Sequence, residues 1–184
     1  MIKIMSTTRV EVILGCMFSG KSTELLRRTN RYKAIGKNIL LVNHTYDVRT
    51  DQAIETHSKI KQNAIKTDKL LSILESQEFN NSDVVGIDEA QFFPDLLDFV
   101  KKAERLNKII IVAGLDGDYK REPIGQILQV IPLCDEVVKL TAMDMIDKDG
   151  SPGIFSKRIV EGDGQVLVGA NESYAAVSRK NYFE

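Results

Sequence analysis

The run Gly15–Ser22 (GCMFSGKS) matches the phosphate-binding pattern G-x-x-x-x-G-K-[ST] at every fixed position. A short apolar segment, Val10–Leu14, precedes it, and a segment with helical periodicity, Ser22–Ile35, follows it. Between a strand and a helix, such a loop turns backbone N–H groups toward phosphate oxygens, and the positive end of the helix adds to the attraction. The pattern therefore predicts a nucleoside triphosphate site. The residues expected to contact the nucleotide are Gly15, Cys16, Met17, Phe18, Ser19, Gly20, Lys21 and Ser22.

Two residues of this run have expected roles of their own. Lys21 reaches the β- and γ-phosphates as a point charge, and the Ser22 hydroxyl can ligate magnesium. A chance match in a glycine-containing turn is the alternative, but the strand before the motif and the helix after it favour a true phosphate loop.

Further apolar segments alternate with amphipathic ones, as in a buried parallel sheet. The segments expected as strands are Asn38–Val42, Asp83–Asp88, Lys108–Ala113 and Glu136–Leu140. Pro94 is expected to be the first residue of a helix, and Lys69–Glu75 is expected to form a shorter helix. Residues 43–60 are expected to form a loop or lid. The pattern predicts an α/β fold, a P-loop NTPase-type parallel sheet with helices on both faces.

The pattern changes after about Thr141. Residues 142–164 are rich in Asp, Gly and Lys, and Gln165–Gly169 is one more strand candidate. We expect residues 1–141 to form the nucleotide-binding α/β domain and residues 142–184 a small appended domain of loops and hairpin.

The balance of charged residues limits the classes of binding partner that the sequence predicts. The 184 residues carry 25 Lys and Arg against 26 Asp and Glu, a net charge of −1, which gives no reason to expect attraction to nucleic acid or an anionic membrane. Two cysteines are too few for a disulfide framework, and no stretch approaches the roughly 20 apolar residues of a membrane span. Without a visible secretory signal, the expected location is the cytoplasm.

The apolar run from Val84 ends in two acids, Asp88 and Glu89. Asp88 is the natural second contact to magnesium, and Glu89 would point into the same cleft, where a carboxylate can accept a proton from an attacking hydroxyl. The alternative is a pair of acids that caps the strand or the next helix. Gln91, two residues on, is grouped with Asp88 among the nucleotide-binding residues.

Other polar and aromatic side chains follow strands at the same expected edge, where ligands of such sheets collect. Asp47 and Arg49 could hold an acceptor or a phosphate, with an exposed ion pair as the alternative. Phe92, Phe93 and Tyr119 could line an acceptor pocket, although aromatic residues are more often plain core. The spacing of the two histidines supports no metal site.

Four runs give the chain a specific resemblance. They are GCMFSGKSTELLRR, GIDEAQFFPDLLDF, VAGLDGDYKREPIG and the terminal KLTA of the fifth strand. Together they resemble the type II thymidine kinases, and the similarity spans nearly the whole chain, from about Val10 to Phe183. The phosphate loop is shared by many families, whereas DE-x-QFFPD with LDG-x-x-x-x-x-P is much more specific.

The resemblance implies transfer of the γ-phosphate of ATP, with magnesium, to the 5′-hydroxyl of thymidine, giving thymidine monophosphate for DNA synthesis through nucleotide salvage. It implies that Glu89 is the general base and that Ser22 and Asp88 serve magnesium. It implies a lasso loop over thymine within Ser156–Val168 and the segment to Tyr174, and a homo-oligomer, usually a tetramer. The acceptor residues that it implies are Met17, Asp47, Arg49, Phe92, Leu115, Tyr119, Ser156, Val166, Val168 and Tyr174.

The chain departs from that family at the zinc site, which commonly consists of four cysteines in the small domain. The matching positions hold Asp144, Asp147, Ser178 and Asn181, none of them a thiolate. Structural zinc sites use Cys and His, so zinc is not expected. Four oxygen-bearing groups could suit a hard cation, but we expect hydrogen bonds and packing to replace the metal.

Two other classes of function stay open from the residues alone. An ATPase acting on nucleic acid would share the phosphate loop, although such proteins often carry basic patches or stacking aromatics, and this chain is near neutral and has no Trp. A non-catalytic nucleotide-binding protein would fit the lost zinc ligands, but the retained Lys21, Asp88 and Glu89 favour catalysis.

Overall fold

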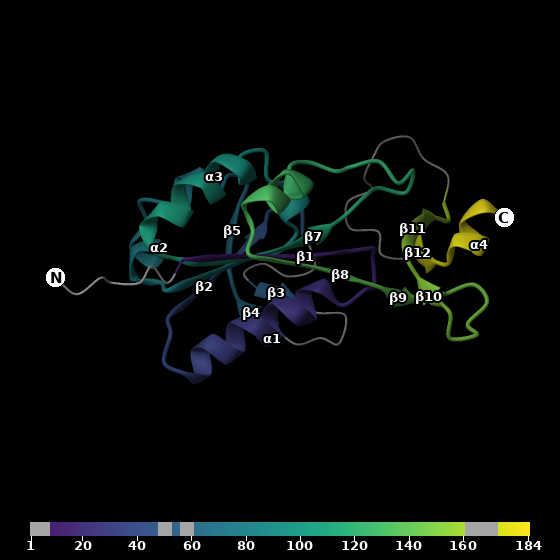
Figure 1. Cartoon of the computed structure of the whole chain (residues 1–184), viewed down its shortest axis with the longest axis horizontal. Helices are drawn as coiled ribbons and strands as arrows, with labels where there is room; N and C mark the ends of the chain where they lie inside the picture. The colour runs from purple at the N-terminus through teal and green to yellow at the C-terminus, as the bar shows by residue number, and fades with distance from the viewer. Residues whose placement is uncertain (1–7, 48–52, 56–60, 161–172) are drawn as a thin grey trace.

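The computed structural model describes residues 8–47, 53–55, 61–160 and 173–184, and its centre is a six-stranded sheet (Figure 1). The strand order is β5-β2-β6-β7-β1-β8, and every neighbouring pair is parallel. Its strands are β1 (Arg9–Gly15), β2 (Ile39–His44), β5 (Ile65–Thr67), β6 (Val84–Ile87), β7 (Ile109–Leu115) and β8 (Glu136–Leu140). The predicted α/β parallel sheet is confirmed, with β5 as an edge strand that the prediction lacked.

Helices cover both faces of the sheet, as predicted. In Figure 1, α1 lies on one face and α2 and α3 lie on the other. The helices and helical turns are α1 (Lys21–Ala34), η1 (Leu71–Ile73), α2 (Gln77–Asn81), η2 (Ala90–Phe92), α3 (Leu96–Ala103), η3 (Glu104–Leu106) and η4 (Ile127–Leu133). Where a short helix was predicted over Lys69–Glu75, the chain forms only the single turn η1.

Alternating side chains of the strands build one core on each face. Val10, Val12 and Leu14 of β1 pack with Phe99 of α3 in the first core, and Ile13 packs with Leu25 of α1 in the second. Because both faces are covered, the central strands β6 and β7 are apolar throughout, which is why they could be predicted from apolar runs.

The prediction of an irregular stretch over residues 43–60 was wrong at two places. Residues 43–44 continue β2, and β3 (Ala53–Glu55) pairs antiparallel with β4 (Lys61–Asn63). Three-residue strands carry too little alternation to be recognised in a sequence. Residues 48–52 and 56–60 lie outside the described part of the chain.

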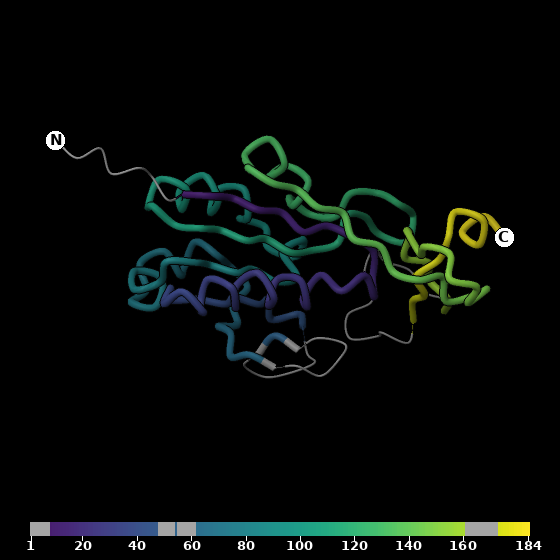
Figure 2. Tube along the Cα trace, turned by 60° about the horizontal axis from the view of Figure 1, so that its bottom comes forward, coloured from purple at the N-terminus to yellow at the C-terminus, as the bar shows by residue number. Residues whose placement is uncertain are grey.

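The C-terminal elements gather beyond the carboxyl ends of the sheet strands, in both views (Figures 1 and 2). They are two antiparallel strand pairs and a short helix: β9 (Ala142–Met143) with β10 (Pro152–Gly153), β11 (Phe155–Arg158) with β12 (Tyr174–Val177), and α4 (Arg179–Phe183). The predicted strand Gln165–Gly169 lies outside the described residues. In the described ranges, no helix has the length and apolar character needed to cross a bilayer.

Candidate active site

The phosphate loop connects β1 to α1 through backbone that needs glycine at two places. Gly20 has φ 82°, in the left-handed region where a side chain is strained. At Gly15, an added Cβ would lie 2.5 Å from the Ser19 Oγ and 2.6 Å from the Leu140 carbonyl oxygen. The second contact shows that the loop is packed against the end of β8, so any side chain at Gly15 would displace it.

Hydrogen bonds inside the loop converge on one carbonyl. The Lys21 Nζ and the Ser19 Oγ both donate to the carbonyl oxygen of Cys16, at 2.7 Å and 2.8 Å. Burial lowers the pKa of Lys21, and among the attractions that oppose this shift Glu89 exerts the largest. Burial also raises the pKa of the Cys16 thiol, which argues against a nucleophilic role for this cysteine.

The two predicted acids follow β6, next to the loop. Asp88 is buried, and its backbone N–H donates to Val42 of β2. Glu89 is half-buried and has φ 51°, a left-handed conformation that is uncommon for a residue other than glycine. Such conformations persist where the surroundings enforce them, and they cluster at active sites.

Gln91 holds the side chain of Glu89. Its Nε2 donates to the Glu89 Oε2 at 2.8 Å, and its Oε1 accepts from the backbone N–H of Leu115 at 3.0 Å. Gln91 was grouped with the nucleotide-binding residues, and in this structure its side chain contacts the candidate base. Gly125 has φ 57°, and a Cβ there would lie 2.0 Å from the Gln91 carbonyl oxygen. The loop between β7 and η4, which contains Gly125, therefore packs directly on η2.

The carboxyl end of β2 brings a second polar group to the same edge of the sheet. Asp47 is buried, accepts from the Asn43 Nδ2 at 2.7 Å, and its carbonyl accepts from Lys66. The ring of His44 lies 5.7 Å from that of Phe92, and burial lowers the pKa of His44. Asp47 and half-buried Phe92 thus lie near the edge where an acceptor was expected. Arg49 lies outside the described residues.

Phe93, which was considered with Phe92 for the pocket, is fully buried in the core between the sheet and α3. Its alternative assignment, plain core, is therefore the one that the structure supports.

The segment after β7 carries Tyr119 on a self-closed turn. Asp118 Oδ1 accepts from the backbone N–H groups of Lys120 and Glu122, at 2.8 Å and 2.9 Å. Outside the turn, the hydroxyl of Tyr182 in α4 donates to the Tyr119 carbonyl at 2.9 Å. The guanidinium of Arg121 lies over the same Tyr182 ring, 4.4 Å from its centroid. These contacts fix the backbone that presents Tyr119.

The C-terminal strands contact the phosphate loop directly. The backbone N–H of Met17 donates to the Ser156 Oγ at 3.0 Å, and the Cys16 Sγ donates to the Gly153 carbonyl at 3.2 Å. Tyr174 of β12 is buried, and its hydroxyl accepts from the Arg158 Nη2 at 2.9 Å. Ser156 and Tyr174 therefore lie at this end of the molecule, whereas Val166 and Val168 lie outside the described residues.

Arg158 was not among the predicted site residues. Its guanidinium lies 3.9 Å from the ring centroid of Tyr119 as well as against Tyr174. The alternation in β11, which places Ser156 and Arg158 on one face of the strand, is the sequence signal that could have identified it.

The four positions that replace the family's cysteines gather around Asp144. Its buried carboxylate accepts from the backbone N–H groups of Ile146, Asp147 and Ser178 and from the Asn181 Nδ2. Burial acts to raise the pKa of Asp144, but these hydrogen bonds outweigh burial and hold the pKa below its ordinary value. Within the described ranges, no group of three or more His, Cys, Asp and Glu is placed to hold a metal ion.

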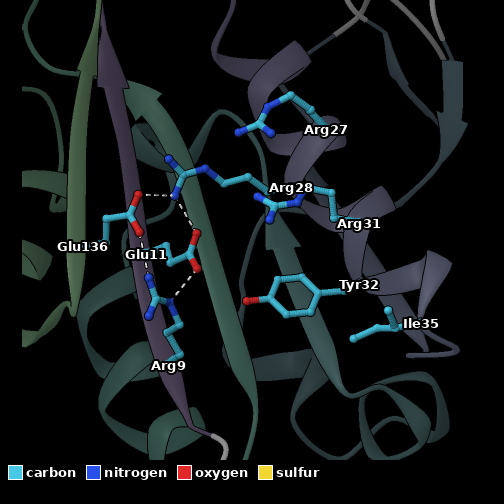
Figure 3. Close-up of a pocket in the computed structure, with 8 residues that line it drawn as sticks. All are labelled: Arg9, Glu11, Arg27, Arg28, Arg31, Tyr32, Ile35 and Glu136. Carbon is cyan, nitrogen blue, oxygen red and sulfur yellow. Dashed lines mark hydrogen bonds and ion pairs between the residues drawn. The ribbon is translucent and has the colours of Figure 1, made fainter.

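Figure 3 shows a pocket between β1, β8 and α1 that contains none of the predicted site residues. Arg28 and Arg9 both point at Glu11 and Glu136, with Arg28 Nη1 bonded to Glu11 Oε2 at 2.5 Å. The ion pairs of Arg28 with Glu11 and Glu136 in this pocket join α1 to strands β1 and β8.

The site combines complementary chemical groups. Lys21 and the N-terminal end of α1 provide positive charge for a triphosphate, and Glu89 provides a carboxylate beside it. Tyr119 and Tyr174 both contact Arg158 near the C-terminal strands, and Phe92 lies beside His44 at the end of β2. This arrangement suits transfer of a phosphoryl group to an acceptor that must lose a proton.

A family model and two viral relatives match nearly the whole chain. A family model described as "Thymidine kinase" matches residues 8–182. The thymidine kinase of Vaccinia virus (strain Western Reserve) is 41% identical over 98% of this chain and 99% of its own length, and that of Monkeypox virus is 39% identical over the same shares. Among solved structures, flagellar accessory protein FlaH from Methanocaldococcus jannaschii aligns with a TM-score of 0.49 and 14% identity, covering 84% of this chain and 73% of its own.

Proposed function

The chain belongs to the thymidine kinase family and is a kinase that phosphorylates thymidine with ATP as donor, and on this basis we propose that Glu89 is the general base of the transfer. The observation that carries the proposal is the left-handed backbone of Glu89 directly after β6, with its carboxylate close enough to Lys21 of the phosphate loop to attract the buried ammonium. In this scheme Glu89 orients the 5′-hydroxyl of thymidine and takes its proton while the γ-phosphate is transferred in line.

The phosphate loop holds the triphosphate in this proposal. Lys21 and the loop amides of residues 15–22 bind the β- and γ-phosphates and spread the charge of the transferring group. Magnesium fits the donor set, because Ser22 at the start of α1 and Asp88 at the end of β6 offer the oxygen ligands that it prefers. Bound there, it would neutralise charge on the phosphate oxygens.

The acceptor side of the proposal uses residues from both parts of the chain. Asp47, Phe92, Leu115 and Tyr119 come from residues 1–141, which we propose as the nucleotide-binding domain. Ser156 and Tyr174 come from residues 142–184, which we propose as a small domain that completes the thymidine pocket. Their support is the contact between Ser156 and the phosphate loop.

Three further properties belong to the proposal: the oligomeric state follows from the family resemblance, the location from the sequence expectation, and the lack of zinc from the four residues without thiolates at the family's cysteine positions. We propose that the enzyme is a homo-oligomer, a tetramer, that it acts in the cytoplasm, and that it needs no zinc. Sedimentation of the purified protein measures the first, and metal analysis of the same sample measures the last.

The variant Glu89→Gln tests the base. The amide keeps the size of the side chain but cannot accept the proton, so turnover should fall by about 10²–10⁴-fold while ATP binding stays near that of the wild type. Thymidine monophosphate formation and nucleotide binding are measured on the same preparation. The control is Glu78→Gln, an exposed acid on α2, which should keep full activity. Wild-type turnover in Glu89→Gln would remove Glu89 from the role.

A further inference from the structure

Arg158 occupies a strand position that faces the candidate site. In the antiparallel pair of β11 and β12, Arg158 lies directly opposite Tyr174. Ser156 precedes it by two residues and therefore lies on the same face of β11, where its hydroxyl accepts from the Met17 N–H of the phosphate loop. The face of β11 that carries Arg158 is thus turned toward the residues that bind substrates.

The guanidinium of Arg158 contacts two aromatic residues from separate parts of the chain. Its Nη2 donates to the Tyr174 hydroxyl at 2.9 Å, and its carbon lies 3.9 Å from the ring centroid of Tyr119. A planar guanidinium can stack on one ring while its fork donates in its own plane to another group, which a lysine ammonium cannot do. Arg158 is therefore the link between Tyr119 and Tyr174.

The hydrogen bond from Arg158 determines where the Tyr174 hydroxyl can donate its own hydrogen. A phenolic hydroxyl has one hydrogen to donate, and when the oxygen accepts from a cation that hydrogen points to another partner. Arg158 covers one face of the Tyr119 ring, and the Lys120 Nζ lies 5.5 Å from the centroid of the same ring, so the position of the guanidinium limits how a bound nucleoside can meet Tyr119.

We propose that Arg158 is a positioning residue for the acceptor, which holds Tyr119 and Tyr174 in the orientation that binds thymidine. The inference rests on the proposed function, because it takes Tyr119 and Tyr174 as acceptor residues. Arg158 acts on their side chains and makes no contribution to the proton transfer.

The backbones of both tyrosines have anchors that do not depend on Arg158. The Tyr119 carbonyl accepts from the Tyr182 hydroxyl, and Tyr174 is held in the strand pair with β11. Loss of the guanidinium should therefore leave the fold in place and release only the two side chains. This separates a positioning role from a structural one.

Steady-state kinetics of Arg158→Met tests the proposal. The variant keeps an unbranched apolar side chain without the charge and the fork, so the KM for thymidine should rise about tenfold, as expected for loss of one charge-assisted hydrogen bond. The kcat and the KM for ATP should stay close to wild type. Arg158→Lys keeps the charge without the planar stack and should fall between the two. The control is Arg179→Met, which removes an exposed arginine that lies over the Phe155 ring.

A double-mutant cycle with Tyr174→Phe gives the second readout. If Arg158 acts through the Tyr174 hydroxyl, Arg158→Met should raise the KM for thymidine much less in the Tyr174→Phe background than in the wild type. Independent, multiplying effects would overturn the inference, and so would an unchanged KM in Arg158→Met.

Two single variants separate this inference from the proposed function. If Tyr119→Ala and Tyr174→Phe both leave the KM for thymidine unchanged, the acceptor site itself is misplaced and the inference falls with it. If they raise the KM but Arg158→Met does not, only the inference is wrong. Equal melting temperatures of all variants exclude unfolding as the cause. If Arg158→Met melts at a lower temperature than the wild type, Arg158→Lys replaces it in the cycle.

Discussion

At the scale of single residues, the hydrogen bonds of Gln91 explain how the candidate base is held. One end of its amide is fixed by the Leu115 N–H of β7, and the other end donates to the Glu89 carboxylate. Since β7 is a central strand, Gln91 transfers the rigidity of the sheet to a side chain on a strained turn. The orientation of Glu89 therefore depends on a residue that does not itself take part in the chemistry.

The variant Gln91→Glu should change the pH dependence of the reaction. Its carboxylate can still accept from Leu115, but it faces Glu89 with negative charge instead of an N–H donor. Two carboxylates that share a site favour protonation of one of them, so a working base would require a higher pH. The acid limb of the kcat profile should move upward by about one pH unit or more.

The matched control is Gln91→Met, which removes both hydrogen bonds without adding charge. It should lower kcat without moving the acid limb. If the profile of Gln91→Glu coincides with that of the wild type, Gln91 does not position the base.

The same residues show what a sequence can predict. Gly20, Lys21 and Ser22 were predicted because the local chain conformation around a phosphate requires those residue types. The contact of Gln91 with Glu89 and the contact of Arg158 with Tyr119 were not predicted. They depend on how separate segments meet in the fold, and nothing local marks a glutamine or an arginine for such a contact.

At the scale of elements, the strands and helices that could be predicted are the long ones with a clear pattern. α1 is long enough to show helical periodicity, and the buried strands β1, β6 and β7 stand out as apolar runs. The prediction missed β3, β4 and β5, each of three residues, and η4, a 3-10 segment with Pro132 inside it. The three-residue strands are too short to show a pattern, and Pro132 interrupts the helical pattern of η4.

The C-terminal elements show how hydrogen bonds can organise a segment around one buried carboxylate. Asp144 follows β9, and its carboxylate accepts from the backbone N–H groups of Ile146 and Asp147 in its own turn and from that of Ser178, the N-cap of α4. A single side chain thus joins β9 to α4. The bonds need its ionised form, as the lowered pKa of Asp144 indicates.

Asp144→Asn should therefore destabilise the protein in a pH-dependent way. The amide turns one acceptor into a donor that faces the N–H groups of Ser178 and Asn181. Because the pKa of Asp144 is lower in the folded state, its contribution is present above about pH 4 and is lost as the pH falls through the folded pKa. The melting temperature of the variant should be lower than that of the wild type at pH 7, and the difference should shrink toward pH 3.

The control is Asp149→Asn, an exposed acid in the same turn that accepts from Ser151. Its melting temperature should stay close to that of the wild type at pH 7. A zinc chelator should leave the wild-type melting temperature unchanged, and a marked fall with chelator would show that a metal and not Asp144 organises the segment.

At the scale of the whole molecule, the C-terminal elements and the phosphate loop are in direct contact. Their contact is concentrated at Cys16, Met17, Gly153 and Ser156, where strand β11 and the end of β10 meet the loop. The segment that is proposed to bind thymidine therefore touches the segment that is proposed to bind ATP. Occupation of one should change the affinity of the other, and by linkage the change must be the same in both directions.

Ser156→Ala should weaken that coupling. The variant removes the acceptor of the Met17 N–H, a hydrogen bond worth about 0.5–1.5 kcal/mol, so the coupling factor between the two substrates should fall by about two- to tenfold. Calorimetric titration of a non-hydrolysable ATP analogue, with and without saturating thymidine, measures the factor. The control is Ser151→Ala, whose hydroxyl donates to Asp149 in the neighbouring turn and does not contact the loop in the described structure. Equal coupling in the wild type and Ser156→Ala would show that the two parts of the site bind their substrates independently, despite the contact between them.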